Sequence, residues 1–194
     1  MEIIKKRRSI RRFLSKKIPF EILNQILEAG TLAPSPKNRQ PWKFVVIQTT
    51  AEKEKFINDL KTGIEKLIKK KPERSDIYMS IETIHILEQV PVIVLVCYNN
   101  NLTLIHDDGV DWQMQAKDIE VVDIQSIGAA VQNMLLEATE LGIGSLWCGD
   151  ILYAYPYISY YSAYPIISAV CFGYTNISPN MPCRKAISDV CNFI

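Results

Sequence analysis

The chain has only two histidines, and it contains no P-loop sequence and no G-x-S-x-G sequence. These absences exclude the usual phosphate loop of nucleoside triphosphate enzymes and the nucleophile elbow of α/β-hydrolases. His85 is predicted to be a structural or surface residue. His106 precedes three aspartates, but their spacing differs from that of an EF-hand loop. We therefore expect an exposed acidic turn there and no metal site; the aspartates are Asp107, Asp108 and Asp111.

Cysteine is also scarce, and its pattern excludes a disulfide framework. The five cysteines are an odd number and form no C-x-x-C pair. They lie in apolar or irregular surroundings, which suit reduced thiols, so we expect a reducing compartment, the cytoplasm. The basic N-terminus is followed only by single apolar residues and pairs, and it thus lacks the apolar core of a secretory signal. An arginine-rich transit peptide stays open as the less favoured alternative. The cysteines are Cys97, Cys148, Cys171, Cys183 and Cys191.

Charge is scarce in one long stretch, since residues 151–183 contain no Asp, Glu, Lys, Arg or His. The stretch is long enough to span a bilayer. Four prolines and the six tyrosines between Tyr153 and Tyr164 argue against a transmembrane helix, because they would break it and place hydroxyl groups in the bilayer. We expect a short tyrosine-rich helical or irregular piece, followed by a buried strand.

The net charge of +1 hides a strong asymmetry along the chain. Residues 1–75 carry 19 Lys and Arg against 8 Asp and Glu, whereas residues 76–194 carry 3 against 13. Such a basic half suggests an anionic partner, namely nucleic acid, a membrane surface or a phosphorylated small molecule. A solvated basic face is the alternative that accounts for most of the lysines.

Hydrophobic periodicity predicts a mixture of helices and strands in a single domain over residues 1–194. Neither internal repeats nor low-complexity linkers divide the chain, and the elements show no regular βαβ rhythm, which favours an α+β fold. Helices are expected at 20–29 with Gly30 as the stop, at 51–71 before Pro72, and at 123–141 before Gly142. Strands are expected at 44–48, 90–98, 143–147 and 166–172.

The N-terminal segment crowds Arg7, Arg8, Ser9, Arg11 and Arg12 into six residues. Guanidinium groups and a hydroxyl so close together are able to surround a phosphate with charge-assisted hydrogen bonds. From this segment alone, a disordered basic arm and a nucleic-acid contact stay open as alternatives.

A second segment, APSPKNRQPW at residues 33–42, lies directly before an expected strand. Its prolines restrict the backbone, and the amides of Asn38 and Gln40 offer both donors and acceptors. Such amides suit the edge of a planar heterocycle that is rich in carbonyls and ring nitrogens.

At this point the chain resembles the FMN-dependent nitroreductases. The resemblance rests on RRSIRRF at 7–13, APSPKNRQPWKF at 33–44, DIQSIGAAVQNMLLEATELGIGSLWCG at 123–149, CFGY at 171–174 and PCRK at 182–185. It implies a nitroreductase fold, with a central mixed β-sheet surrounded by helices. It also implies an intertwined homodimer with FMN at the subunit interface.

The resemblance further implies the residues that bind the cofactor. Arg7, Arg8, Ser9 and Arg11 would bind the FMN phosphate and ribityl oxygens, and Arg184 with Lys185 would complete the phosphate pocket. A loop against the isoalloxazine ring, contributed in part by the partner chain, would consist of Pro34, Ser35, Pro36, Asn38 and Gln40. Backbone N–H groups of Cys148 and Gly149 would lie near the flavin N5.

In this interpretation no side chain is catalytic, because the flavin itself accepts hydride from NADH or NADPH and passes it to a small acceptor such as a nitroaromatic or a quinone. Reductive dehalogenation and flavin turnover are alternatives on the same fold. A basic protein that binds nucleic acid or a membrane surface is disfavoured, since no aromatic residue is interleaved with the arginines before Phe13. The chain departs from the pattern of this family in two regions. We expect the neutral segment 151–164 to be either buried or part of a dimer surface, and the sequence of the region 99–122 indicates no substrate.

Overall fold

The computed structural model describes residues 2–99 and 116–194, so the aspartates around His106 lie outside the described residues. A four-stranded sheet in the order β1-β2-β4-β3 forms the middle of the molecule. Its strands are β1 (Trp42–Ile47), β2 (Val92–Tyr98), β3 (Gly144–Cys148) and β4 (Ile166–Gly173). All neighbouring strands pair antiparallel, and the α+β class is confirmed. The mixed character expected of the sheet is limited, among the described residues, to one parallel bridge between Ser9 and Ser145.

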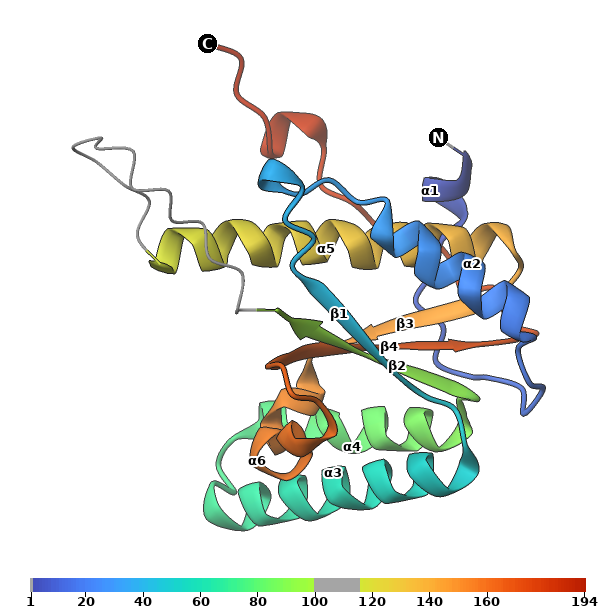
Figure 1. Ribbon diagram of the computed structural model, residues 1–194, viewed down its shortest axis with the longest axis vertical. Helices are drawn as coiled ribbons and strands as arrows, with labels where there is room; N and C mark the ends of the chain where they lie inside the picture. Colours follow the sequence, from blue (N-terminus) through green and yellow to red (C-terminus); the bar gives the residue numbers. More distant parts are fainter. Residues whose placement is uncertain (1, 100–115) are drawn as a thin grey trace.

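Helices cover both faces of this sheet, which gives three layers (Figure 1). One face carries α2 (Phe20–Thr31) and the long α5 (Ala116–Glu140). The other carries α3 (Thr50–Lys70), α4 (Ser75–Gln89) and the short α6 (Tyr155–Ile158). A further short helix, α1 (Glu2–Lys6), precedes the arginine-rich segment.

The apolar run of β2 is buried because it contributes to both cores. Successive side chains of a strand point to opposite faces. Ile93 and Leu95 accordingly join the core under α3 and α4, whereas Val92 and Val94 join the core under α2 and α5. This arrangement explains why the segment shows no alternation of apolar and polar residues.

Two expectations about helix ends have opposite outcomes. Gly142 has φ +71°, a left-handed conformation that ends the helical chain after α5, as predicted. The prediction that Gly30 stops its helix is wrong, because α2 continues through it to Thr31. Gly30 serves close packing instead, since an added Cβ would lie 2.9 Å from Cγ of Met134 on α5.

The tyrosine-rich segment folds as short helical turns, η2 (Asp150–Ala154), α6 and η3 (Ser159–Tyr161), as expected. Its hydroxyl groups bond to the outer helices: Tyr161 donates to Asp59 Oδ2 at 2.8 Å, and Tyr153 donates to Asp76 Oδ2 at 2.6 Å. The Lys55 ammonium lies 5.0 Å from the centre of the Tyr160 ring. The segment therefore packs against α3 and α4 of its own chain.

The two ends of the chain meet the sheet in different ways. The N-terminal segment runs beside β3, where the amide of Ile10 donates to the Ser145 carbonyl at 2.9 Å. The C-terminal segment leaves the body of the molecule after β4 (Figure 1). It exposes apolar side chains, with exposed fractions of 70% for Ile187, 63% for Val190 and 90% for Phe193.

Candidate functional site: a pocket of arginines and a strained amide loop

Four arginines from the two ends of the chain line one pocket of about 370 Å³, which we call the arginine pocket. The pairing of the N-terminal segment with β3 brings its arginines to the C-terminal segment. The lining residues are Arg7, Arg8, Ser9, Arg11, Pro179, Asn180, Pro182 and Arg184. Five of the predicted phosphate-binding residues thus come together, whereas Lys185 is exposed and is not among the lining residues.

Arg8 has a different part in this pocket from its neighbours. Its Nε donates to the carbonyl of Pro179 at 3.2 Å. Its Nη1 donates to the carbonyls of Lys5 at 2.5 Å and Arg7 at 2.8 Å. Because these bonds engage backbone oxygens at both ends of the chain, Arg8 holds the walls of the pocket together.

The arginine pocket concentrates positive charge. Burial lowers the pKa of Arg7, and the positive charges of Arg184 and Arg8 lower it further. Among the described residues that line the pocket, none is Asp or Glu. Guanidinium groups keep their charge at neutral pH, so a bound anion would relieve this mutual repulsion.

The second predicted segment forms a strained turn, the amide loop, from Pro34 to Gln40. Lys37, Asn38 and Gln40 have φ of 52°, 53° and 49°, in the left-handed region that L-residues rarely adopt. The Ser35 hydroxyl accepts from the Gln40 amide at 2.9 Å and supports this conformation. Residues other than glycine in the left-handed conformation cost on the order of 1 kcal/mol each, and they are enriched at binding sites. The side chains of Asn38 and Gln40 are exposed, and Nε2 of Gln40 donates to the Asn38 carbonyl at 3.4 Å.

A buried ion pair joins the amide loop to α5. Arg39 donates to both carboxylate oxygens of Asp123, from Nε at 3.1 Å and from Nη2 at 2.9 Å. The hydroxyl of Tyr98, at the end of β2, donates to Asp123 Oδ2 at 3.3 Å. Sequence reasoning missed these three residues because Arg39 is one of 22 basic residues, and nothing local pairs it with a carboxylate 84 positions away.

Cys148 and Gly149 lie at the end of β3 with contrasting surroundings. The Cys148 thiol is buried, with its Sγ 3.8 Å from Sγ of Cys171. The thiol contact with Cys148, followed by burial, raises the pKa of Cys171 well above its ordinary value, so the Cys171 thiol stays neutral in the core. Gly149 is exposed, and a Cβ added there would meet no atom within 4 Å. The Gly149 backbone is therefore open to a flat ligand.

Neither the amide loop nor Gly149 contributes to the lining of the arginine pocket. The predicted site residues thus form separate groups within one chain. All five cysteines are unpaired, as predicted. His85 is exposed and lies 3.2 Å from Glu88 Oε2, which confirms a surface position.

In residues 2–99 and 116–194, no group of three or more His, Cys, Asp or Glu is placed to hold a metal ion. Within the same ranges, no helix has the length and apolar character needed to cross a membrane.

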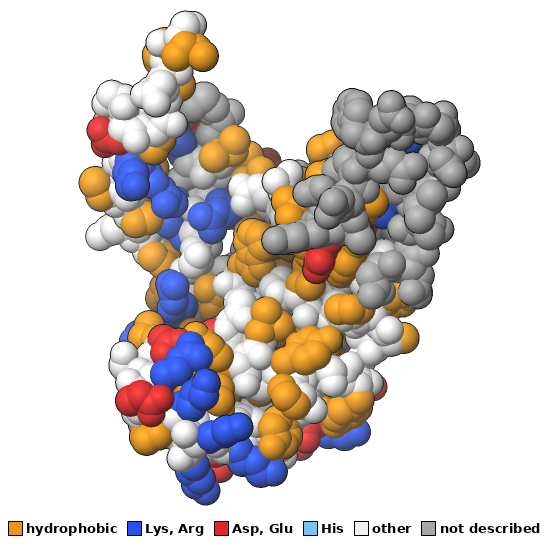
Figure 2. All heavy atoms as spheres, turned by 90° about the vertical axis from the view of Figure 1, so that its left-hand side faces the viewer, with side chains coloured by type: hydrophobic (Ala, Val, Ile, Leu, Met, Phe, Trp, Pro, Cys, Tyr) orange, Lys and Arg blue, Asp and Glu red, His pale blue; other side chains and the backbone are white. Residues whose placement is uncertain are grey.

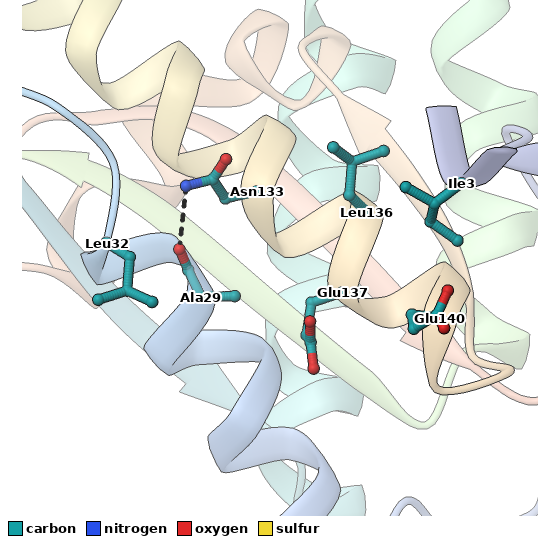
Figure 3. Close-up of a pocket in the computed structure, with 7 residues that line it drawn as sticks. All are labelled: Ile3, Ala29, Leu32, Asn133, Leu136, Glu137 and Glu140. Carbon is teal, nitrogen blue, oxygen red and sulfur yellow. Dashed lines mark hydrogen bonds between the residues drawn. The ribbon is translucent and has the colours of Figure 1, made fainter. Parts of the chain in front are cut away.

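A further pocket, of about 320 Å³, lies where α1, α2 and α5 meet (Figure 3). Asn133 on α5 donates from Nδ2 to the carbonyl of Ala29 on α2 at 3.2 Å and closes its floor. Leu32 is 76% exposed at its edge. The remaining lining residues are Ile3, Leu136, Glu137 and Glu140.

Comparison with known proteins identifies relatives of this chain. A protein of Methanothermobacter thermautotrophicus, provisionally named an NADH dehydrogenase/NAD(P)H nitroreductase, is 28% identical over 149 residues, covering 77% of this chain and 60% of that protein. The chain thus spans less than two thirds of the length of that relative.

Two solved structures share the fold over nearly the full chain. A provisionally assigned nitroreductase from Desulfovibrio desulfuricans in complex with FMN is 27% identical with a TM-score of 0.72, covering 98% of this chain and 93% of that chain. A BluB-like flavoprotein from Clostridium difficile is 25% identical with a TM-score of 0.79, covering 100% and 97%. The model of the nitroreductase family matches residues 4–174, from the arginine-rich segment to the end of β4. The chain therefore belongs to the nitroreductase family.

Proposed function

We propose that the protein is an FMN-dependent oxidoreductase that takes hydride from NADH or NADPH and delivers it to a small acceptor such as a nitroaromatic or a quinone. The observation that carries this proposal is the arginine pocket, whose described lining contains four guanidinium groups and no carboxylate. A phosphate monoester carries up to two negative charges and several acceptor oxygens, which suit such a pocket. The family relative solved with FMN supports this choice of anion.

The residues of the pocket divide the binding of the phosphate among them. Arg7, Arg11 and Arg184 would supply charge-assisted hydrogen bonds, and the Ser9 hydroxyl would add a neutral one. Arg8 already donates to three carbonyls and would act mainly by holding the two chain ends together.

The amide loop and the end of β3 would bind the flavin ring. The exposed amides of Asn38 and Gln40 match the carbonyl and ring-nitrogen edge of an isoalloxazine. The open space beside Gly149 allows a planar ring to approach a backbone N–H there. Pro34, Ser35 and Pro36 would shape this loop, and Cys148 would contribute its backbone, because its thiol points into the core.

When bound, FMN supplies the hydride chemistry through its N5 atom. The chain's own residues bind, orient and shield the group, and we assign none of them a covalent or acid-base step. Donor and acceptor would then use the same site in turn, and steady-state rates should show parallel double-reciprocal lines. Intersecting lines would contradict this shared-site order.

The separation of the amide loop from the arginine pocket supports a site shared between two copies of the chain in a homodimer. Exposed apolar side chains on the C-terminal segment and on α2 provide surface for such a contact. These include Phe193 on the C-terminal segment, exposed by 90%, and Phe20 on α2, exposed by 71%. Sedimentation should find a dimer, and a monomer that still binds stoichiometric FMN would contradict the shared site.

The visible spectrum of the purified protein tests the proposal directly. We expect a yellow protein that is bleached under anaerobic conditions by NADH, NADPH or both. Titration with FMN and with riboflavin separates the two parts of the site, because riboflavin lacks the phosphate and would not engage the arginines. A colourless protein that binds neither compound would overturn the proposal. The five unpaired thiols support a reducing compartment, the cytoplasm, as its place of action.

A second candidate is other flavin chemistry, either reductive dehalogenation or flavin turnover, at the same site. The similarity to a BluB-like flavoprotein over the full chain favours keeping it. Incubation of the reduced protein with oxygen identifies flavin turnover, because that reaction consumes FMN, whereas an oxidoreductase and a reductive dehalogenase both return it unchanged. Release of halide ion from a halogenated aromatic compound identifies dehalogenation.

A further inference from the structure

The pair formed by Arg39 and Asp123 differs from the other ion pairs in the described part of the chain. Its side chains are only 6% and 1% exposed, whereas those of Arg74 and Asp76 are 42% and 48% exposed. Two parallel hydrogen bonds, at 3.1 and 2.9 Å, fix the guanidinium plane against the carboxylate. A third bond, from Tyr98, restricts Asp123 itself.

The position of Arg39 in the amide loop gives this pair its consequence. Arg39 has ordinary helical backbone angles, φ −64° and ψ −30°, but the residues on both sides, Asn38 and Gln40, are left-handed. An arginine held at its side-chain end by α5 sets the direction in which these two neighbours point. The chain continues to Pro41, whose carbonyl accepts from the Asn99 amide at 2.7 Å, so the residue that follows β2 supports the loop from the other end.

Stability alone is a poor reason for such a pair. A buried ion pair is often no more stable than well-packed apolar residues of similar volume, because removing two charges from water costs several kcal/mol per ion. A bidentate pair specifies one orientation, which an apolar contact does not.

We infer that Arg39 and Asp123 are positioning residues, which hold the amide loop in the strained conformation that presents Asn38 and Gln40 to the flavin ring. The inference deepens the proposed function and rests on it for the identity of the ligand. The geometry of the loop itself is measurable without any ligand.

The first experiment measures amide hydrogen exchange in the loop of the full chain without added flavin. Asp123→Asn keeps the shape of the side chain but removes its charge and one acceptor. We expect exchange at the Gln40 amide to accelerate by at least about tenfold, since the strained turn opens more often. The matched control is Asp76→Asn, which alters an exposed Arg–Asp pair on α4 and should leave the loop amides unchanged. Equal exchange in Asp123→Asn and the unaltered protein would overturn the inference.

The second experiment separates positioning from stability. The double variant Arg39→Met with Asp123→Leu replaces the ion pair by apolar side chains and should restore the melting temperature lost in Asp123→Asn. Its FMN dissociation constant should stay at least about tenfold above that of the unaltered protein, with a shifted flavin absorption band, because the loop has lost its orientation. Recovery of FMN affinity together with stability would overturn the inference and leave the pair a structural role. If the unaltered protein binds no FMN, the proposed function fails, and the exchange result still decides whether the pair sets the loop.

Discussion

The arginines of the arginine pocket and Arg39 in the amide loop are the same residue type in opposite environments. Burial, and then the positive charges of Arg184 and Arg8, lower the pKa of Arg7. Arg39 is buried against Asp123, and two hydrogen bonds join the pair. We propose that the first group binds an anionic ligand and that the charge of Arg39 fixes the conformation of the loop.

The surface of the protein shows a third use of basic residues. Lys and Arg side chains gather over the lower part of the face in Figure 2, where α3 and α4 lie, whereas hydrophobic side chains occupy its middle. Lys61 on α3 and Glu88 on α4 pair at 2.6 Å with both side chains about 40% exposed, a setting in which ion pairs contribute little. The burial and the partners of a basic residue therefore indicate its role, and its frequency in the sequence does not.

We expect the largest effect from a substitution at Asp123, in the buried ion pair. Asp123→Ala leaves a buried guanidinium without the carboxylate that neutralises it, and we expect the free energy of unfolding to fall by about 3–5 kcal/mol. Urea denaturation measures this change. Asp76→Ala removes an exposed carboxylate that accepts from Arg74 and Tyr153, and we expect a much smaller loss of stability, because solvent screens these contacts. Equal effects at the two positions would show that burial does not distinguish these pairs.

Arg11→Ala and Arg184→Ala test the arginine pocket, whose described lining contains no carboxylate. Each removes a charge-assisted contact worth about 1.5–3 kcal/mol, so FMN should bind more weakly by a corresponding factor while the fold is retained. Riboflavin affinity should not change. Arg12→Ala is the control, since Arg12 is exposed and is not among the residues that line the pocket. Unchanged FMN affinity in both pocket variants would refute the assignment of the phosphate site.

Glycine substitutions test whether the left-handed backbone of the amide loop lowers the stability of the protein. Lys37 has φ 52°, and Lys37→Gly removes left-handed strain, so we expect stability to rise by up to about 1 kcal/mol. Glu65→Gly, at an exposed position inside α3, should lower stability by about 1 kcal/mol, because helical glycine is unfavourable. Chemical denaturation of both variants compares the signs. A loss of stability in both would argue against strain at Lys37.

The smallest expected effect is at alkaline pH. Burial, and then the charge of Asp123, raise the pKa of Tyr98 above its ordinary value. Above pH of about 10 the unfolded chain loses this proton while the folded protein keeps it, so stability falls as pH rises through the folded pKa. Tyr98→Phe should make the alkaline limb of the stability profile shallower. The same dependence of stability on alkaline pH in the variant would show that the pKa of Tyr98 is not raised by folding.

The secondary structure was predictable where composition and periodicity agreed. The β-branched run of β2, the wide apolar stripe of α5 and the lysine-faced helix α3 all appear near their expected positions. We made no prediction for residues 75–89, which form α4, and the apolar pattern of this helix is blurred: Ser80 is buried on it, whereas Met79 is 64% exposed. The contacts of α4 with α3 and with the tyrosine-rich segment, which periodicity does not record, decide its burial.

The candidate site was also predictable from the sequence only in part. The sequence by itself determined the strands, most helices, the family motifs and the excess of arginine near the N-terminus, because these depend on local spacing and residue type. The family resemblance predicted that Arg184 joins Arg7 in one pocket, and the structure brings them together. Only the tertiary structure decided that Gly30 packs against Met134 instead of ending α2, and that Arg39 is neutralised by Asp123. Each of these outcomes depends on contacts between residues far apart in the chain, and an arginine carries the same charge in the sequence whether folding places it beside a carboxylate or beside other arginines.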